Sequence, residues 1–198
     1  MTMEKNIDTI RYKKALDFAY SFYKEKFRKG ISFPYFNYLS SVSNLIIENN
    51  GNTDEAIAAL IHDYFELESL RRKSNFIKKK FGVKVYNIIK QCSDHESKNY
   101  DRENWLNFKK KYLESMQKKS QSTLLVVMCD KLHSLTCMIN DHNKIGKKLW
   151  KNHNQPPEEI LWYYKVLCKN IKKYLKNHKT LKDKLQRNVN ELEYKIKS

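Results

Sequence analysis

The stretch AIAALIHDYFE, residues 56–66, is an apolar helical run with three polar side chains at its end. His62 and Asp63 are adjacent, and Glu66 follows one helical turn after the histidine. Imidazole and carboxylate groups are common ligands of divalent metal ions. An apolar, buried helix has little reason to end in such groups unless something binds there. We therefore predict that this stretch carries a binding site.

A second carboxylate lies in a similar setting far along the chain. The apolar run from Leu124 to Cys129 leads directly into Asp130. Burying an unpaired carboxylate costs free energy, so such an aspartate is normally paired, protonated or metal-bound. We expect Asp130 to be coupled to His62 or Asp63 in the folded protein.

The composition predicts an all-α fold in one domain. The chain has 198 residues, which is enough to bury one sizeable core. It contains four glycines and three prolines, and no run of alternating apolar and polar residues persists. Apolar spacing and capping residues predict helices at about residues 8–27, 34–48, 53–66, 74–81, 83–92, 104–118, 120–141 and 158–178. Residues 93–102 are polar and predict a loop.

The C-terminal segment is basic and amphipathic. Between residues 168 and 198, ten Lys or Arg outnumber three Asp or Glu. Apolar side chains recur there every three or four positions, at Leu181, Leu185, Val189, Leu192 and Ile196. This pattern predicts either a final helix docked on the domain or a short coiled-coil seam that joins two chains.

The net charge of +17 suits anionic partners such as nucleotides, nucleic acid or acidic membrane surfaces. The lysines are spread along the chain instead of forming an arm or block, which is typical of a solvated surface. No zinc finger or similar motif supports nucleic-acid recognition. Nucleic-acid binding is therefore the least favoured functional hypothesis.

The cysteines and the N-terminus predict a cytoplasmic protein. None of the four cysteines forms a Cys-x-x-Cys pair, and most lie among apolar residues, which favours buried free thiols in a reducing compartment. Residues 1–6 are polar and lack an apolar signal core. The sequence contains no stretch of about 20 apolar residues, so we predict no membrane span.

Several short motifs follow one another in an order typical of one known family. They are Arg28-Lys29-Gly30 with Pro34-Tyr35, residues 54–63, Phe81-Gly82, residues 129–135, and Trp150 with residues 161–164. The series covers about residues 15–174. It resembles the HD-domain phosphohydrolases, and in particular the guanosine-tetraphosphate hydrolase domain of RelA/SpoT proteins and its stand-alone bacterial relatives. The resemblance implies an HD-domain helix bundle at residues 8–178, followed by a C-terminal helical extension at residues 179–198.

The chemistry that this resemblance implies is metal-assisted hydrolysis of a phosphate ester or pyrophosphate, with a nucleotide such as a guanosine polyphosphate as substrate. The metal ligands would be His62, Asp63 and Asp130, and the family favours Mn²⁺. A bound divalent ion polarises phosphoryl oxygen and lowers the pKa of water. Glu66 would act as the catalytic base, while Arg28 and Lys29 would bind substrate phosphates.

Two of the chain's departures from the family pattern affect the metal ligands and the groups that handle water. Tyr38 stands where the family has its first metal histidine, and a phenol with a pKa of about 10 is a poor metal ligand. Leu67 stands where an aspartate follows the catalytic glutamate. These departures predict impaired turnover. They leave open a catalytically degenerate HD domain that binds a nucleotide or a protein without hydrolysing it.

The site residues also have purely structural interpretations. His62 would then be hydrogen-bonded to Asp130 in a metal-free core. Glu66 would be a solvated residue at a helix end. Arg28 and Lys29 would favour the C-terminal end of the first helix through their charge.

Overall fold

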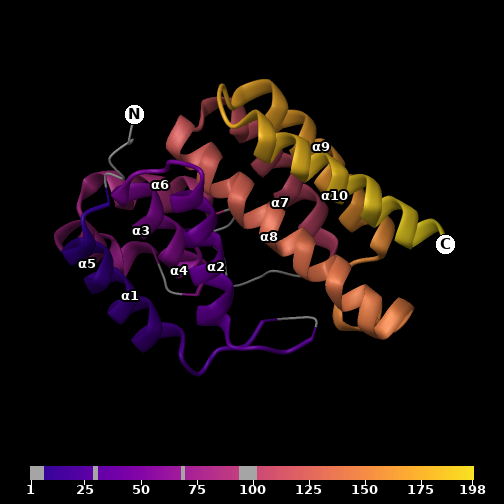
Figure 1. Ribbon diagram of the computed structural model, residues 1–198, viewed down its shortest axis with the longest axis horizontal. Coiled ribbons are helices and arrows are strands. Elements are labelled where there is room, and N and C mark those ends of the chain that lie inside the picture. Colours follow the sequence, from indigo (N-terminus) through magenta and orange to yellow (C-terminus); the bar gives the residue numbers. More distant parts are fainter. Residues whose placement is uncertain (1–6, 29–30, 68–69, 94–101) are drawn as a thin grey trace.

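The computed structural model describes residues 7–28, 31–67, 70–93 and 102–198, without the side chains of residues 67, 70–73 and 102–104. This part of the chain is all-α, as predicted, and its only bridge between extended residues joins Phe27 and Pro34. Figure 1 shows the helices in chain order. They are α1 (Thr9–Tyr23), α2 (Tyr35–Glu48), α3 (Thr53–Ile61), α4 (Tyr64–Leu67), α5 (Leu70–Phe81), α6 (Val83–Cys92), α7 (Arg102–Ser115), α8 (Gln121–Ile145), α9 (Pro157–Tyr174) and α10 (Lys179–Lys197), with short 3-10 segments at Met116–Lys118 and Gly146–Asn152.

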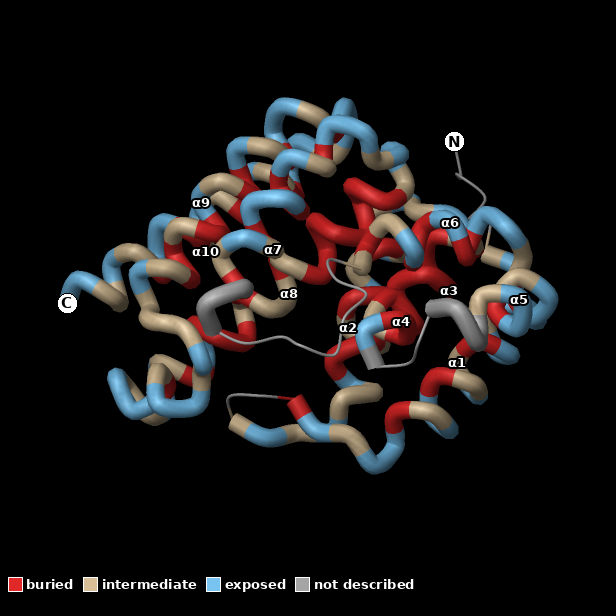
Figure 2. The backbone as a smooth tube through the Cα atoms, turned by 180° about the vertical axis from the view of Figure 1, so that it is seen from behind, coloured by how far each residue is buried: buried red, intermediate tan, exposed pale blue. Residues whose placement is uncertain are grey.

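Helix α3 lies at the centre of the N-terminal half and packs against α1, α2, α6 and α8. Asn52 and Glu55 form a capping box at its start, which satisfies backbone amides that a helix N-terminus otherwise leaves unpaired. Nearly all of its residues are buried (Figure 2). The residues at the C-terminal end of helix α3 therefore lie in the interior of the protein.

The prediction of one continuous helix from residue 53 to Glu66 is wrong. The chain instead turns at His62 and Asp63 before α4 begins. The Nδ1 atom of His62 bonds the carbonyl of Ala59 at 2.8 Å. In an unbroken helix that carbonyl would accept the amide of Asp63. A new turn starts where the amide of Glu66 donates to the carbonyl of Asp63 at 3.1 Å. The break therefore occurs at the predicted ligand residues themselves.

The first helix ends at Tyr23, before the predicted end at Phe27. The backbone there is extended and pairs with the start of α2, because the amide of Arg28 donates to Phe33 and that of Tyr35 donates to Lys26. Extended residues alternate in direction, so Phe27 is 61% exposed while Arg28 is buried. Gly30 of the Arg28-Lys29-Gly30 motif lies outside the described residues.

Helix α8 crosses the molecule beside α2, α3 and α6. Ser120 caps it, as predicted, by accepting the amide of Thr123 at 3.1 Å. The helix extends past the predicted end at Asp141 to Ile145, where Gly146 adopts a positive φ of 59°. The continuous stretch Gln121–Asn152 is long and apolar enough to pass a composition test for a membrane span, but 67% of its apolar window is buried inside the protein. It is a core helix here, and the described chain contains no clear membrane span.

The C-terminal helices α9 and α10 pack on each other and on α8 (Figure 1). Helix α9 ends at Tyr174 instead of His178, because the side-chain amide of Gln121 bonds both the Tyr174 carbonyl and the Lys176 amide. The apolar stripe of α10 is buried against its own chain at Leu181, Leu185, Val189 and Leu192. The stripe is therefore a docked helix, which was one of the two predicted alternatives, and it gives no support to a seam between chains.

Two other predicted boundaries also change. Helix α5 begins at Leu70, ahead of the predicted start at Ser74, and helix α7 ends at Ser115 before a 3-10 turn. The predicted loop at residues 93–102 lies almost entirely outside the described residues. The four cysteines are free and buried, as predicted.

Candidate metal and phosphate site

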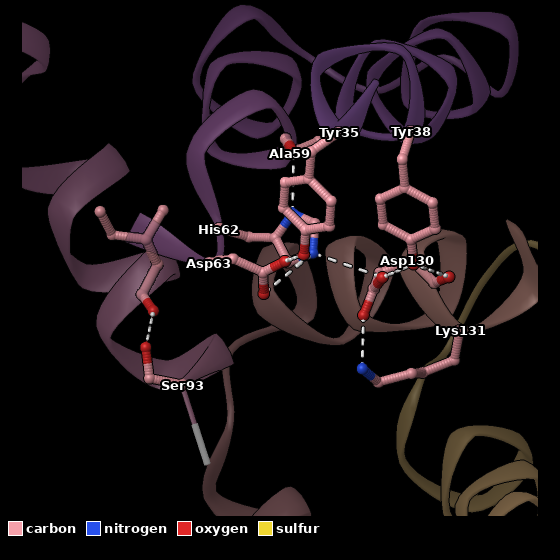
Figure 3. A network of polar contacts seen from close by, with 9 residues as sticks. Tyr35, Tyr38, Ala59, His62, Asp63, Ser93, Asp130 and Lys131 are labelled. Carbon is pink, nitrogen blue, oxygen red and sulfur yellow. Dashed lines mark hydrogen bonds and ion pairs between the residues drawn. The ribbon is translucent and has the colours of Figure 1, made fainter. Parts of the chain in front are cut away.

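The turn after α3 places His62 in the interior, where it is 4% exposed. Its Nδ1 atom must carry a proton, because the Ala59 carbonyl that it contacts can only accept. The other ring nitrogen, Nε2, lies 3.4 Å from Oδ1 of Asp63 and 3.3 Å from Oδ1 of Asp130 (Figure 3). Nε2 is buried and makes no hydrogen bond of acceptable geometry within the described structure. The carboxylates of Asp63 and Asp130 thus both lie close to His62, although Asp130 is far along the chain from the other two predicted metal ligands.

Asp130 is buried in α8 and is held by two neighbours. The Tyr38 hydroxyl donates to its Oδ1 atom, and Nζ of Lys131 lies 2.7 Å from its Oδ2 atom. Burial alone would raise the pKa of Asp130, but the nearby charges of Lys131 and His62 outweigh it and hold this pKa well below its ordinary value. Asp130 is therefore a carboxylate, coupled to His62 as predicted.

Asp63 is held in a similar way by the same helix. Tyr35 and Tyr38 project from α2 with their rings stacked at 5.7 Å, and Tyr35 donates its hydroxyl to Oδ2 of Asp63 (Figure 3). Burial, followed by the nearby carboxylates, raises the pKa of both tyrosines well above the ordinary value. Both groups therefore remain neutral phenols, and Tyr38 acts as a hydrogen-bond donor to Asp130.

Two cationic groups also neutralise this cluster of carboxylates. Burial lowers the pKa of His62, but Asp63 and Asp130 outweigh that effect and raise it from 6.5 to about 10. In the metal-free protein at neutral pH, His62 is accordingly an imidazolium. Lys131 supplies the second positive charge beside Asp130. The cluster therefore contains two carboxylates and two cations.

The donor types suit a divalent ion, because one imidazole nitrogen and carboxylate oxygens face a common point with Nε2 of His62 left unbonded. Across the described ranges, however, no group of three or more His, Cys, Asp or Glu side chains is already arranged to hold a metal ion. Tyr35, Tyr38 and Lys131 instead contact the carboxylate oxygens of Asp63 and Asp130. An ion would have to replace some of these contacts.

A cavity of about 590 Å³ opens beside this cluster. Acidic, basic and aromatic side chains share its lining, which consists of Lys26, Phe27, Arg28, Tyr35, Tyr38, Asp63, Glu66, Asp130, Lys131, Ser134, Met138 and His153. Another cavity, of about 640 Å³, lies at the N-termini of α3 and α8 and contains none of the predicted site residues. The first cavity is therefore the candidate site.

Glu66 and Arg28 both reach this cavity, but not in the predicted way. Glu66 is exposed and lies on α4, so the predicted shared helical face with His62 does not exist. Arg28 is buried, and its Nη1 atom pairs with Oδ2 of Asp141 at 2.8 Å. It is therefore not a surface residue at a helix end. Lys29 lies outside the described residues, and the side chain of Leu67 is likewise not described.

Sequence reasoning gave no role to Tyr35 or Lys131. A signal existed for Tyr35 alone. Tyr35 and Tyr38 are three positions apart, a spacing that places two side chains on one face of a helix. Lys131 directly follows Asp130, although adjacent helical residues do not normally face each other. Only the folded chain shows that both side chains turn toward the carboxylates.

The family model for the HD domain matches residues 15–153. This chain belongs to the HD domain family. The match includes the turn after α3 and the part of α8 that carries Asp130, so it covers every predicted site residue. HD domains generally bind divalent metal ions. No curated protein matches the sequence significantly.

Solved structures share this HD fold at low sequence identity. One is a metazoan ortholog of SpoT that hydrolyses ppGpp; it has a TM-score of 0.70 and 19% identity over 91% of this chain and 94% of that chain. Another is lmo0812 from Listeria monocytogenes EGD-e, with a TM-score of 0.66 and 17% identity over 81% of this chain and 99% of that chain. These likenesses confirm the predicted fold, including helices beyond the matched family model.

Proposed function

We propose that the protein is a phosphohydrolase that cleaves a phosphate ester or pyrophosphate of a nucleotide, such as a guanosine polyphosphate. The observation that carries this proposal is one cavity that is lined by Asp63 and Asp130 together with cationic side chains. Its volume of about 590 Å³ lies within the usual range for small-ligand sites. Membership of the HD domain family supports the reaction class.

The residues that would hold a divalent ion are His62, Asp63 and Asp130, and we propose Mn²⁺ as that ion. When bound, the ion would polarise a phosphoryl oxygen and make water more acidic. The Ala59 carbonyl orients the His62 ring, as is usual for a ligand histidine. Glu66 lies in the same cavity as Asp63 and is the proposed base that takes a proton from the attacking water.

The nucleotide assignment follows from how charge and aromatic surface are distributed. Lys26, Arg28 and Lys131 line the cavity and would neutralise phosphate groups, with Lys29 as a further proposed contact. Phe27 also lines the cavity and is 61% exposed, which leaves its ring accessible for stacking on a base. Phosphate-binding cations beside an accessible ring suit a nucleotide better than a simple phosphomonoester.

The direct test is hydrolysis by the purified chain with Mn²⁺, using guanosine polyphosphates and other nucleotides, with separation of the products. Asp63→Ala and Asp130→Ala should each abolish turnover, and Glu66→Gln should reduce it strongly. Asp17→Ala is a suitable control, because Asp17 is 65% exposed and pairs only with Lys13 among the contacts described for it. Nucleotide binding without turnover by the intact chain would instead indicate the degenerate binding module.

Three further properties stay predictions. Residues 8–178 would form the HD domain proper, with residues 179–198 as its extension. The free, buried cysteines suit a reducing compartment, and we propose a cytoplasmic location. No contact described here favours nucleic-acid binding over nucleotide binding.

A further inference from the structure

Lys131 forms an ion pair with the residue directly before it. Its Nζ atom lies 2.7 Å from Oδ2 of Asp130, and its side chain is 25% exposed. Adjacent residues on an α-helix point in different directions, so the lysine side chain must fold back to make this contact. The same side chain lines the candidate cavity. Lys131 therefore contacts the buried carboxylate and is also accessible to an anion that enters the cavity.

Both oxygens of Asp130 are already engaged in the metal-free protein. Oδ1 accepts the Tyr38 hydroxyl and faces His62, while Oδ2 is paired with Lys131. A divalent ion that uses Asp130 has to compete with these donors, and the ammonium group also repels it. The contacts of Asp130 thus oppose ion binding as long as Lys131 stays in place.

The two donors differ in how easily they can leave. Tyr38 is 5% exposed, and its ring is stacked on Tyr35 within the core. Lys131 is held at its tip by the carboxylate, and a lysine side chain is a flexible stem that ends in a strongly hydrated point charge. A phosphate group in the cavity would offer that charge an alternative partner. Lys131 is therefore the contact that a ligand can remove.

We propose that Lys131 couples the binding of a phosphate-like anion to the binding of a divalent ion, by moving from Asp130 to the anion. In the absence of an anion, Lys131 holds Asp130 and weakens ion binding. With an anion in the cavity, Asp130 is released and the ion binds more tightly. Coupling between two ligands is reciprocal, so the ion strengthens anion binding by the same factor. This inference rests on the ion site of the proposed function.

The test is to measure Mn²⁺ affinity from the electron paramagnetic resonance signal of free Mn²⁺, in sodium sulfate and in sodium chloride of equal ionic strength. Sulfate serves as a tetrahedral dianion that cannot be hydrolysed, and a protein-free titration corrects for its own Mn²⁺ complex. For the natural chain, sulfate should tighten Mn²⁺ binding by about 5-fold or more, within the usual range of such couplings. In Lys131→Met, Mn²⁺ should bind more tightly in chloride, and sulfate should change its affinity by less than about twofold.

Lys26→Met is the matched control. Lys26 lines the same cavity but is not among the residues that hold Asp130. Its removal should weaken sulfate binding without strengthening Mn²⁺ binding in chloride, which separates the ion pair from the general charge of the cavity. Lys131→Arg keeps the charge and should retain the coupling, while circular dichroism confirms that each variant is folded.

Three results would overturn the coupling. They are unchanged Mn²⁺ affinity in Lys131→Met, an undiminished sulfate effect in that variant, and no sulfate effect in the natural chain. Nucleotide hydrolysis measured separately distinguishes the two proposals. Turnover without coupling would support the proposed function and contradict this inference. Coupling without turnover would support this inference and contradict the proposed hydrolysis.

Discussion

The hydroxyl of Tyr38 donates to Oδ1 of Asp130, the same carboxylate oxygen that lies 3.3 Å from Nε2 of His62. A phenol thus satisfies an oxygen that would otherwise be available to an ion. This contact joins α2 to α8, and both of its residues line the candidate cavity. It also ties the stability of the metal-free protein to the chemistry of the site.

Replacing Tyr38 with phenylalanine should separate these two effects. In EDTA, Tyr38→Phe should lower the free energy of unfolding by about 1.5–3 kcal/mol, because it removes a buried hydrogen bond to a charged group. The same variant should bind Mn²⁺ severalfold more tightly, because Oδ1 of Asp130 loses a competing donor. Urea denaturation and Mn²⁺ titration measure the two quantities.

Tyr12→Phe is the control for that variant, because it removes a 2.9 Å hydrogen bond between Tyr12 and Ser43 that lies outside the candidate cavity. It should cost about 0.5–1.5 kcal/mol and leave Mn²⁺ affinity unchanged. Equal Mn²⁺ affinity in Tyr38→Phe and the natural chain would show that Tyr38 does not compete with the ion.

The stability of the metal-free protein should fall as the pH rises from about 6.5 to about 10. The pKa of His62 is raised from 6.5 to about 10 in the folded protein. Between these values the folded state binds one proton more than the unfolded state, so raising the pH favours unfolding. Urea denaturation in EDTA across this range should show the decline.

The variant His62→Gln should show a smaller decline over the same pH range, because it lacks the titrating group. The difference in slope between the natural chain and the variant isolates the contribution of His62 from those of other groups. Identical slopes would mean that His62 is not held as an imidazolium. Saturating Mn²⁺ should also flatten the slope of the natural chain, since an ion and a proton compete for Nε2.

Removing Arg28 should strongly destabilise the fold. Arg28 and Asp141 form a buried pair at 2.8 Å, with side-chain exposures of 8% and 7%. Arg28→Met leaves the carboxylate of Asp141 buried without that partner and should cost about 3–5 kcal/mol. Thermal and urea unfolding measure the loss.

An exposed ion pair provides the comparison for Arg28. Lys13 and Asp17 lie 2.8 Å apart with side-chain exposures of 75% and 65%. Lys13→Met should cost less than about 1 kcal/mol, because solvent already screens the pair. If the two variants lost similar stability, Arg28 would contribute no more than a surface charge.

Phe27→Ala should weaken nucleotide binding without affecting the fold. The ring is 61% exposed, so its loss should change stability by no more than about 0.5 kcal/mol. Nucleotide affinity should fall by about 1–3 kcal/mol if a base stacks on the ring, while inorganic pyrophosphate should bind as before. Phe76→Ala removes an exposed ring elsewhere and should change neither affinity. An equal loss of nucleotide and pyrophosphate affinity would contradict the stacking role.

The docking of α10 predicts that Leu185→Ala destabilises the folded chain. Leu185 is fully buried, and truncating such a side chain typically costs about 2–5 kcal/mol. Tyr194→Ala on the same helix should have little effect, because Tyr194 is 72% exposed. Sedimentation should show no change of oligomeric state in Leu185→Ala. Loss of a dimer in that variant would favour the seam between chains.

Much of the fold was predictable from local sequence patterns. The pair Asn52 and Glu55 marks the start of α3, and Ser120 marks the start of α8. Both caps act through contacts made within a few residues. Helix ends were less predictable, because distant partners set them. Gln121 ends α9 by bonding backbone groups more than 50 positions away, and the chain after α1 is extended because it pairs with the start of α2. Such partners leave no mark in the segment itself.

The sequence by itself determined the all-α class, the buried helix that ends in His62 and Asp63, and the need of Asp130 for a partner. These follow from apolar periodicity and from the cost of burying charge, both of which are local properties. Only the tertiary structure decided which groups meet the carboxylates. Tyr38 and Asp130 are 92 positions apart, and Tyr35 and Asp63 are 28 apart, so their contacts depend on how α2, α3 and α8 pack. Packing therefore decides that tyrosine hydroxyls and Lys131 hold the carboxylates of the metal-free protein.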